Sequence, residues 1–138
     1  MKKALFILLF LSSLFGEHIK WQGDYNKALQ KAKWSHKPFI VLLIENNCSK
    51  CKDIIRDVFT NQPYIQRLNS SFVAVIVNRD YRYSYPIELY YSTKFPTLFF
   101  VDSQNEMFLV EPIYGNNISV KKIEKVLNEV RLKIGGHG

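Results

Sequence analysis

Two cysteines, Cys48 and Cys51, are the residues of this sequence whose type and spacing best suit covalent chemistry. A disulfide between them would close a very short loop and restrain the unfolded chain little, so the pair suits reaction better than cross-linking. Zinc would need two further ligands, and the histidines, at positions 18, 36 and 137, show no ligand spacing. Covalent haem attachment needs a histidine directly after the second cysteine, where this chain has a lysine.

The local sequence predicts that a strand and a helix position the pair. Residues 39–44 are an unbroken apolar run rich in β-branched side chains, which is typical of a strand buried on both faces. Apolar residues recur at helical spacing over 54–59, so a helix is predicted to begin at the cysteines. At that position Cys48 would face unpaired backbone N–H groups and the positive end of the helix dipole, and both favour a thiolate.

The same placement predicts different roles for the two sulfurs. Lys50 and Lys52 add positive charge near Cys48, so we expect the pKa of the Cys48 thiol to lie below that of a free thiol. Cys51 lies one turn further into the helix and is expected to be better shielded. We therefore predict that Cys48 forms the mixed disulfide with a partner and that Cys51 resolves it.

Hydrophobic periodicity and turn residues give the order of the remaining elements. The predicted elements are a helix around 25–32, a short helix at 63–68, a strand at 72–77, a short helix at 86–91, a strand at 97–101, a return strand at 107–110 after a turn at 102–105, and a helix at 123–134 ended by Gly135 and Gly136. Strands that alternate with helices imply a parallel pair with crossover helices, and the closing hairpin makes the sheet mixed.

The first sixteen residues are predicted to be a secretory signal peptide. Lys2 and Lys3 precede an unbroken apolar run over 4–11, and Ser12-Ser13-Leu14-Phe15-Gly16 follows as the expected exit to the cleavage site. A bilayer crossing needs roughly 20 apolar residues, which this stretch does not reach, so no stable membrane anchor is expected after cleavage. We predict an exported protein, most consistent with the bacterial periplasm, where disulfides persist.

Length and composition are those of one globular domain, residues 17–138. The chain has 138 residues, of which 47% are apolar and 14% aromatic, enough for a core without structural cross-links. Its formal net charge is +7, and +5 without the two lysines of the leader. The lysines are scattered over predicted helix faces with no aromatic–basic groove pattern, so no nucleic-acid partner is expected.

A strand, the Cys-x-x-Cys-Lys sequence and a helix, followed later by Phe95-Pro96-Thr97 before another strand, resemble the thioredoxin superfamily. The segment from Trp21 to Phe39 is similar to the exported branch that includes domains of periplasmic disulfide-handling proteins. The resemblance implies a thioredoxin-like α/β fold, with a central mixed sheet of about four strands flanked by helices. It implies that Pro96 is the family's cis-proline opposite the dithiol and that Gly115 is its glycine before the last helix.

The resemblance also implies a function, an exported thiol–disulfide oxidoreductase that exchanges disulfides with protein substrates. Pro96 would present the backbone of Phe95 to a substrate strand. Leu42 stands where the family usually buries a carboxylate, so Glu45 is the nearest candidate to modulate Cys51, as Lys50 is for Cys48. No metal or organic cofactor is expected, and the partners would be protein thiols or disulfides and a redox partner.

Three alternatives stay open at this point. The residues do not decide whether the exchanger is a reductant, an oxidase or an isomerase, because direction depends on the reduction potential. A non-catalytic thioredoxin-fold module could instead hold Cu(I) between the cysteines or receive apocytochrome cysteines. A purely structural disulfide is the third reading.

Overall fold

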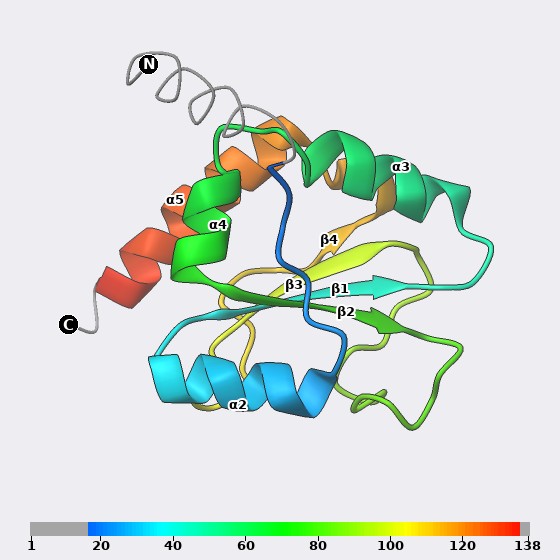
Figure 1. Cartoon of the computed structure of the whole chain (residues 1–138), viewed down its shortest axis with the longest axis horizontal. Coiled ribbons are helices and arrows are strands. Elements are labelled where there is room, and N and C mark those ends of the chain that lie inside the picture. The colour runs from blue at the N-terminus through cyan, green and yellow to red at the C-terminus, as the bar shows by residue number, and fades with distance from the viewer. Residues whose placement is uncertain (1–16, 136–138) are drawn as a thin grey trace, which may run out of the picture.

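The computed structural model describes residues 17–135, and the predicted leader, residues 1–16, lies outside them. In chain order the elements are α2 (Tyr25–Ser35), β1 (Phe39–Ile44), α3 (Ser49–Val58), α4 (Ile65–Ser71), β2 (Val73–Asn78), β3 (Thr97–Val101), β4 (Ile113–Tyr114), the 3-10 turn η1 (Gly115–Asn117) and α5 (Val120–Gly135). The four strands lie in the order β2-β1-β3-β4 (Figure 1). β1 is parallel to β2, and the other pairs are antiparallel, which confirms the predicted mixed sheet.

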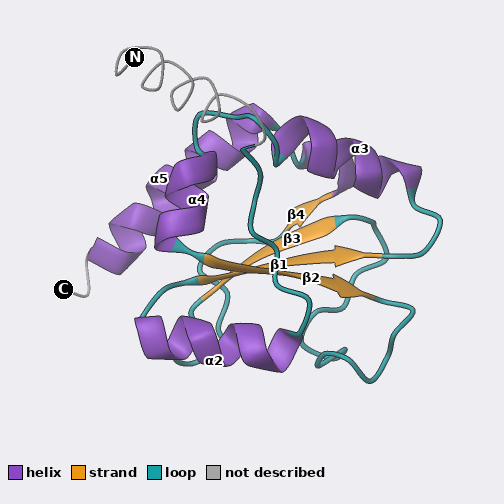
Figure 2. Ribbon diagram, in the orientation of Figure 1, coloured by secondary structure: helices purple, strands orange, loops and turns teal. Residues whose placement is uncertain are grey.

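Strand β1 separates two hydrophobic cores. Its alternating side chains put Ile40 and Leu42 into the core shared with α3, α4 and α5. Phe39, Val41 and Leu43 enter the core shared with α2. Figure 2 shows this layering, with α2 on one face of the sheet and the other three helices on the opposite face. Burial on both faces explains why the run lacks the polar alternation of a half-exposed strand.

Helix α2 begins and ends as its sequence predicts. The side chain of Asp24 caps it by accepting a hydrogen bond from the Lys27 backbone N–H at 2.9 Å. Ala28 and Ala32 are completely buried, so the helix backbone packs close to the sheet. His36 ends the helix with a left-handed backbone (φ 53°), and its N–H donates to the last-turn carbonyls.

The segment before α2, residues 17–22, lies along the outer edge of β2. The backbone N–H of Gln22 donates to the carbonyl of Ala74 at 2.8 Å, and the carbonyl of Gln22 accepts from Ile76 at 3.4 Å. Further hydrogen bonds join the segment to the C-terminal end of α3 and to α4. The segment therefore covers part of an edge that would otherwise be open.

The predicted helix at 86–91 is wrong, because the structure has turns there. The N–H groups of Leu89 and Tyr90 both donate to the carbonyl of Pro86, and no regular helix follows in this part of the described chain. So short a segment has little helical stability of its own. Tertiary packing decides its course, because the Tyr90 ring is completely buried against Tyr25 and Phe99.

The predicted return at 107–110 is confirmed only in part. The chain runs antiparallel to β3 there, with an isolated Val101–Phe108 bridge and backbone hydrogen bonds on both sides of it, but the regular strand paired with β3 is Ile113–Tyr114. The turn at 102–105 forms as predicted, but Glu106 then takes a left-handed backbone (φ 59°). Ile113 is buried, whereas Met107 is largely exposed, so burial places the strand later in the chain.

Smaller differences concern element boundaries. The short helix α4 begins at Ile65, two residues after Pro63, and extends to Ser71. Strand β2 is shifted by one residue, to Val73–Asn78. Such end effects depend on hydrogen bonds that local pattern does not specify.

A buried tyrosine pair joins α2 to the connection between β2 and β3, residues 79–96, hereafter the β2–β3 connection. The hydroxyls of Tyr25 and Tyr90 are 2.9 Å apart. Burial, together with the nearby Glu106 carboxylate, raises the pKa of Tyr25 to about 12. Burial raises the pKa of Tyr90 still further, and burial also raises that of Tyr64.

We predict that the free energy of unfolding falls as the pH rises above 10. The unfolded chain ionises its tyrosines near their ordinary pKa of about 10, whereas the native state retains these protons. The stabilisation is complete below pH 10 and is lost progressively as pH rises through the native pKa of Tyr25, about 12. Urea unfolding between pH 8 and pH 11.5 measures this loss.

Between pH 8 and pH 11.5, the free energy of unfolding of the Tyr25→Phe variant should fall by about 1–2 kcal/mol less than that of the wild type. Tyr83→Phe is the matched control, because the Tyr83 side chain is fully exposed and should not change the decline. A wild-type stability that does not depend on pH up to 11.5 would contradict the prediction.

Candidate active site

The parallel pairing of β1 and β2 brings two loops together at one end of the sheet. Ile44 pairs with Asn78, so Glu45 and Arg79 leave the two strands side by side. Their side chains form an ion pair at 3.4 Å. The loop that leads from β1 to the cysteines therefore starts next to the β2–β3 connection.

The antiparallel pairing of β1 and β3 brings a third segment to the same end. Leu43 pairs with Thr97, so Pro96, directly before Thr97, lies opposite the last residue of β1. The Phe95–Pro96 peptide bond is cis. The carbonyl of Pro96 accepts a hydrogen bond from the N–H of Gly115 at 2.8 Å. Gly115 has a left-handed backbone (φ 53°), a conformation that glycine adopts without steric cost.

Cys48 and Cys51 form a disulfide at the start of α3. Cys48 is the N-terminal cap of the helix, and its sulfur accepts a hydrogen bond from the backbone N–H of Cys51 at 3.1 Å. Cys51 is 2% exposed, whereas Cys48 is half-buried. The predicted helix and the predicted difference in shielding are confirmed.

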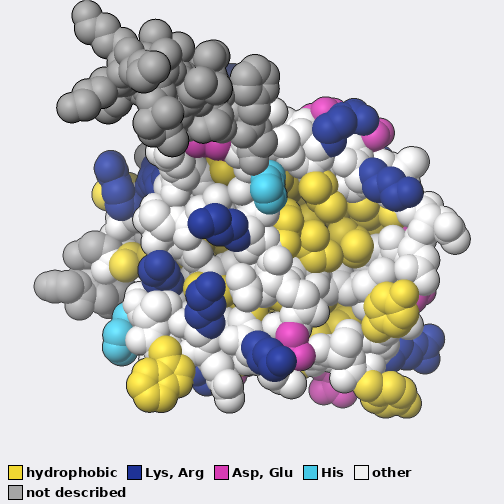
Figure 3. All heavy atoms as spheres, viewed as in Figure 1, with side chains coloured by type: hydrophobic (Ala, Val, Ile, Leu, Met, Phe, Trp, Pro, Cys, Tyr) yellow, Lys and Arg dark blue, Asp and Glu magenta, His cyan; other side chains and the backbone are white. Residues whose placement is uncertain are grey.

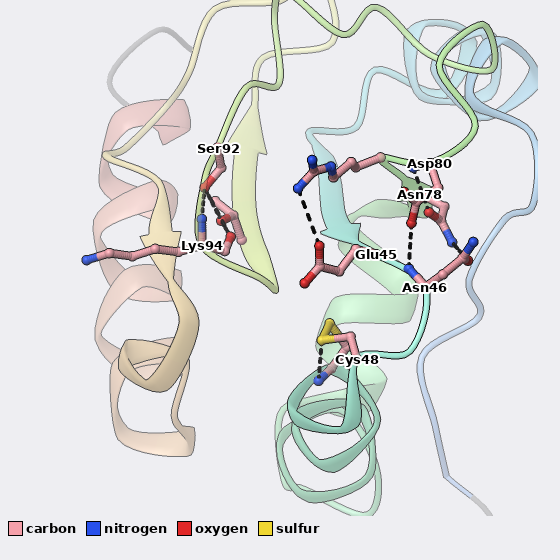
Figure 4. Close-up of a disulfide and its surroundings, with 10 residues drawn as sticks. Glu45, Asn46, Cys48, Asn78, Asp80, Ser92 and Lys94 are labelled. Carbon is pink, nitrogen blue, oxygen red and sulfur yellow. Dashed lines mark hydrogen bonds and ion pairs between the residues drawn. A yellow bond between two sulfur atoms is a disulfide. The ribbon is translucent and has the colours of Figure 1, made fainter.

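The two predicted modulating residues lie on either side of the disulfide in the chain. Lys50 is exposed in the first turn of α3. Glu45 is partly buried, and Figure 4 shows its carboxylate directed into the space between the disulfide and the loop of Ser92 and Lys94. Leu42 is completely buried below, so no carboxyl group occupies that position in the core.

Five residues form a polar clamp between the dithiol loop and the β2–β3 connection: Glu45, Asn46, Asn78, Arg79 and Asp80 (Figure 4). The backbone N–H of Asn46 donates to the Asp80 carboxylate at 2.8 Å. The side-chain amide of Asn78 donates to the side-chain oxygen of Asn46 at 2.9 Å. Together with the Glu45–Arg79 pair, these bonds fix how the loop leaves the sheet.

Arg79 also contacts the segment before the cis-proline. Its guanidinium lies 5.2 Å from the centre of the Phe95 ring, within the range of a cation–π interaction. Arg79 thus touches both Glu45, three residues before Cys48, and Phe95, directly before Pro96.

A second hydrogen-bonded group supports the proline segment from the other side. The Thr97 side chain is completely buried, and its hydroxyl donates a hydrogen bond to the Ser92 hydroxyl at 2.8 Å. The Ser92 hydroxyl in turn accepts from the backbone N–H of Lys94 at 3.1 Å. These bonds shape the tight loop that delivers the chain to Pro96 (Figure 4).

Neither the polar clamp nor the Ser92–Thr97 group is among the features predicted from the sequence. A usable signal existed for the clamp, because Asn78-Arg79-Asp80 ends a buried strand predicted to be parallel to the strand before the cysteines. Polar residues that follow two neighbouring parallel strands lie together at the same end of the sheet. For Ser92 and Thr97 no such signal existed, since a serine in a loop is ordinary.

Among residues 17–135, no group of three or more His, Cys, Asp or Glu side chains is placed to hold a metal ion. No helix in the same residues has the length and apolar character needed to span a bilayer.

Comparison with known proteins identifies the family. A family model described as thioredoxin-like matches residues 20–103, a range that includes the disulfide and the cis-proline. The chain belongs to the thioredoxin-like family. An uncharacterized protein of Borreliella burgdorferi is 32% identical over 123 residues, which cover 87% of this chain and 51% of that protein. The chain spans about half the length of the curated relatives it matches.

Solved structures show the same thioredoxin-like fold. A thioredoxin from Thermus thermophilus superimposes with a TM-score of 0.66 at 22% identity, covering 84% of this chain and 89% of the other. A DsbH oxidoreductase gives a TM-score of 0.56 at 20% identity, with 83% and 86% covered. At these identities the likeness concerns the fold, and the predicted thioredoxin-like architecture is confirmed.

We predict a small but measurable coupling between Glu45 and Arg79. Both side chains are substantially exposed, so the ion pair should contribute about 0.2–1 kcal/mol. A double-mutant cycle with Glu45→Gln and Arg79→Gln, followed by urea unfolding, measures the coupling energy. It should shrink at high salt, because exposed charges are screened.

Arg56 and Asp57 provide the matched control, since they form an exposed pair on α3 away from the clamp. If the Glu45–Arg79 coupling were zero at low salt, the proposed link between the two loops through Arg79 would be wrong.

Proposed function

We propose that this protein is a thiol–disulfide oxidoreductase that exchanges disulfides with protein substrates through Cys48 and Cys51. The observation that carries the proposal is the disulfide at the start of α3, with one sulfur half-buried and the other covered. A disulfide over so short a separation adds little stability, whereas an accessible sulfur at a helix N-terminus is suited to exchange.

In the oxidised form, a substrate thiolate attacks the sulfur of Cys48. The Cys48–Cys51 bond breaks, a mixed disulfide forms at Cys48, and Cys51 leaves as a thiolate that takes a proton. A second substrate thiolate then attacks the substrate sulfur of the mixed disulfide and releases Cys48. The substrate loses two electrons and two protons, and the protein gains them as a dithiol. The reverse sequence reduces a substrate disulfide.

The start of α3 stabilises the leaving and attacking thiolate at Cys48. The Cys51 backbone N–H already points at the Cys48 sulfur, and a thiolate accepts such a bond more strongly than a thiol. The helix dipole and the exposed Lys50 act in the same direction. Within residues 17–135 no hydrogen bond is donated to the Cys51 sulfur, and Cys51 is covered, which suits a resolving thiol that meets only the mixed disulfide.

Phe95 and Pro96 are proposed to position the substrate. Within residues 17–135, neither the N–H nor the carbonyl of Phe95 has a hydrogen-bond partner, so both are available to an extended peptide. Such a peptide would run beside the dithiol, because Pro96 lies opposite the end of β1. Glu45 faces the same space and is proposed to exchange protons with Cys51 through water.

The cellular setting is proposed from the leader. A signal peptide over residues 1–16 would deliver the domain, residues 17–138, to an oxidising compartment such as the bacterial periplasm. Protein thiols or disulfides are the proposed substrates there, with a separate redox partner that restores the starting state.

We predict that the Cys48–Cys51 pair equilibrates with glutathione redox buffers. The expected reduction potential lies between about −270 mV, typical of reductants, and about −120 mV, typical of strong oxidants, and its value assigns the direction. Alkylation of the reduced fraction, read by mass spectrometry, gives the potential. A pair that stays oxidised below about −300 mV would instead be structural, and the enzymatic proposal would fail.

We predict that the two single-cysteine variants behave differently. Cys51→Ser should accumulate mixed disulfides with oxidised protein substrates, because the Cys48 thiolate can attack a substrate disulfide but nothing resolves the product. Cys48→Ser should accumulate at least about tenfold less, since the Cys51 side chain is covered. Non-reducing electrophoresis after acid quenching and alkylation measures both. Equal accumulation would reverse the assignment of roles.

A further inference from the structure

The β2–β3 connection forms two adjoining hollows beside the cis-proline segment. The larger, of about 530 Å³, lies between the connection and the end of β1 and includes Leu43, Arg79 and Arg82 in its lining. The smaller, of about 320 Å³, includes Lys94 and Tyr114. Tyr91, Ser92 and Thr93 line both, so the two hollows form one surface.

All the charged residues that line this surface are cations. Arg79 and Arg82 line the larger hollow, Lys94 lines the smaller, and neither lining contains an Asp or a Glu. Arg79 shares its charge with Glu45, but Arg82 forms no ion pair or hydrogen bond within the described residues. Arg82 is therefore a cation available to a partner.

Exposed aromatic rings accompany these cations. Tyr83 is fully exposed and Tyr91 is 73% exposed, so both rings are accessible to a partner. Figure 3 shows hydrophobic and basic side chains, with some acidic ones among them, at the lower right, over the connection that follows β2. Tyrosine rings and arginines are the side chains that most often anchor peptide partners.

The surface lies where it would contact a substrate bound beside the dithiol. Arg79, in the larger hollow, lies over the Phe95 ring, and Lys94, in the smaller, directly precedes Phe95. A peptide paired with the free backbone of Phe95 would therefore lie next to a cation of each hollow, Arg79 and Lys94. The polar clamp holds the connection to the dithiol loop, which keeps the hollows in register with Cys48.

We propose that the β2–β3 connection is a docking surface for acidic segments that flank the reactive cysteine of a protein substrate. This rests on the proposed function and deepens it, since it names the substrate class of the same site. Carboxylate side chains would pair with Arg82 and Lys94, and neighbouring apolar groups would pack on Tyr83 and Tyr91. Charge complementarity of this kind raises the association rate and selects among substrates.

The test compares dithiol peptides of equal length whose residues beside the cysteines are Asp and Glu in one and Lys in the other. Each peptide is mixed with the oxidised protein, so the peptide forms its disulfide and the Cys48–Cys51 pair gains the two electrons and two protons. Acid quenching, alkylation and mass spectrometry give the second-order rate constant. The acidic peptide should react about tenfold faster at low salt, and the ratio should fall towards one at 0.5 M NaCl.

Charge reversal locates the effect. Arg82→Glu should reduce the acidic-to-basic ratio to about two or less, and Arg82→Gln should give an intermediate ratio. The matched control is Arg131→Glu, which changes the net charge equally but lies on an exposed turn near the end of α5, at the far end of the molecule from the dithiol (Figure 1). The control should retain the wild-type ratio. Circular dichroism and thermal unfolding verify that each variant is folded.

The outcomes separate the two proposals. Equal rates for both peptides, or equal losses in Arg82→Glu and Arg131→Glu, would overturn the docking surface and leave the oxidoreductase in place, because exchange itself would have been observed. A wild-type protein that reacts with neither peptide and does not equilibrate with glutathione would overturn the proposed function, and the docking surface with it.

Discussion

The register of β1 with both of its neighbours is the constraint on which the site depends. Parallel pairing with β2 sets Glu45 beside Arg79, and antiparallel pairing with β3 sets Pro96 opposite the end of β1. A shift of one residue in either ladder would turn every side chain of β1 to the other face and exchange the two cores. Because β1 is buried on both sides, each core opposes such a shift, and the dithiol loop leaves the sheet at a fixed place.

Beyond that buried frame, the site is held by polar contacts of modest strength. The clamp lies at the surface, so each of its bonds contributes little to global stability, but several together restrict how the loop and the connection move. The Ser92–Thr97 group differs, because the Thr97 hydroxyl is buried and would lack a partner if the loop opened. The helix start, the proline segment and the connection are thereby held in place relative to one another by these contacts.

Features that depend on neighbouring residues in the chain were predicted from the sequence, and features that depend on tertiary packing were not. The strand before the cysteines and the helix after them were predicted correctly, since an unbroken apolar run and a capped amphipathic helix are local properties. The helix at 86–91 failed because the burial of Tyr90 against Tyr25, 65 residues away in the chain, overrides a weak local preference. The return at 107–110 forms only an isolated bridge, because the regular pairing with β3 falls slightly later, at the buried Ile113. The role of Arg79 depends on its contacts with Glu45 and Phe95, which are distant from it in the chain and so could not be predicted from local sequence.

The segment at residues 17–22 has a consequence for solubility. It covers part of the outer edge of β2, and at the opposite edge β4 is only two residues long, so neither side of the sheet offers a long unpaired strand. Long open edges recruit other chains into intermolecular sheets and aggregates. Here the backbone N–H and carbonyl that are open to a substrate belong to a single residue, Phe95, near the disulfide. Under the proposed function, the protein would thus bind an extended substrate segment briefly without becoming a template for aggregation.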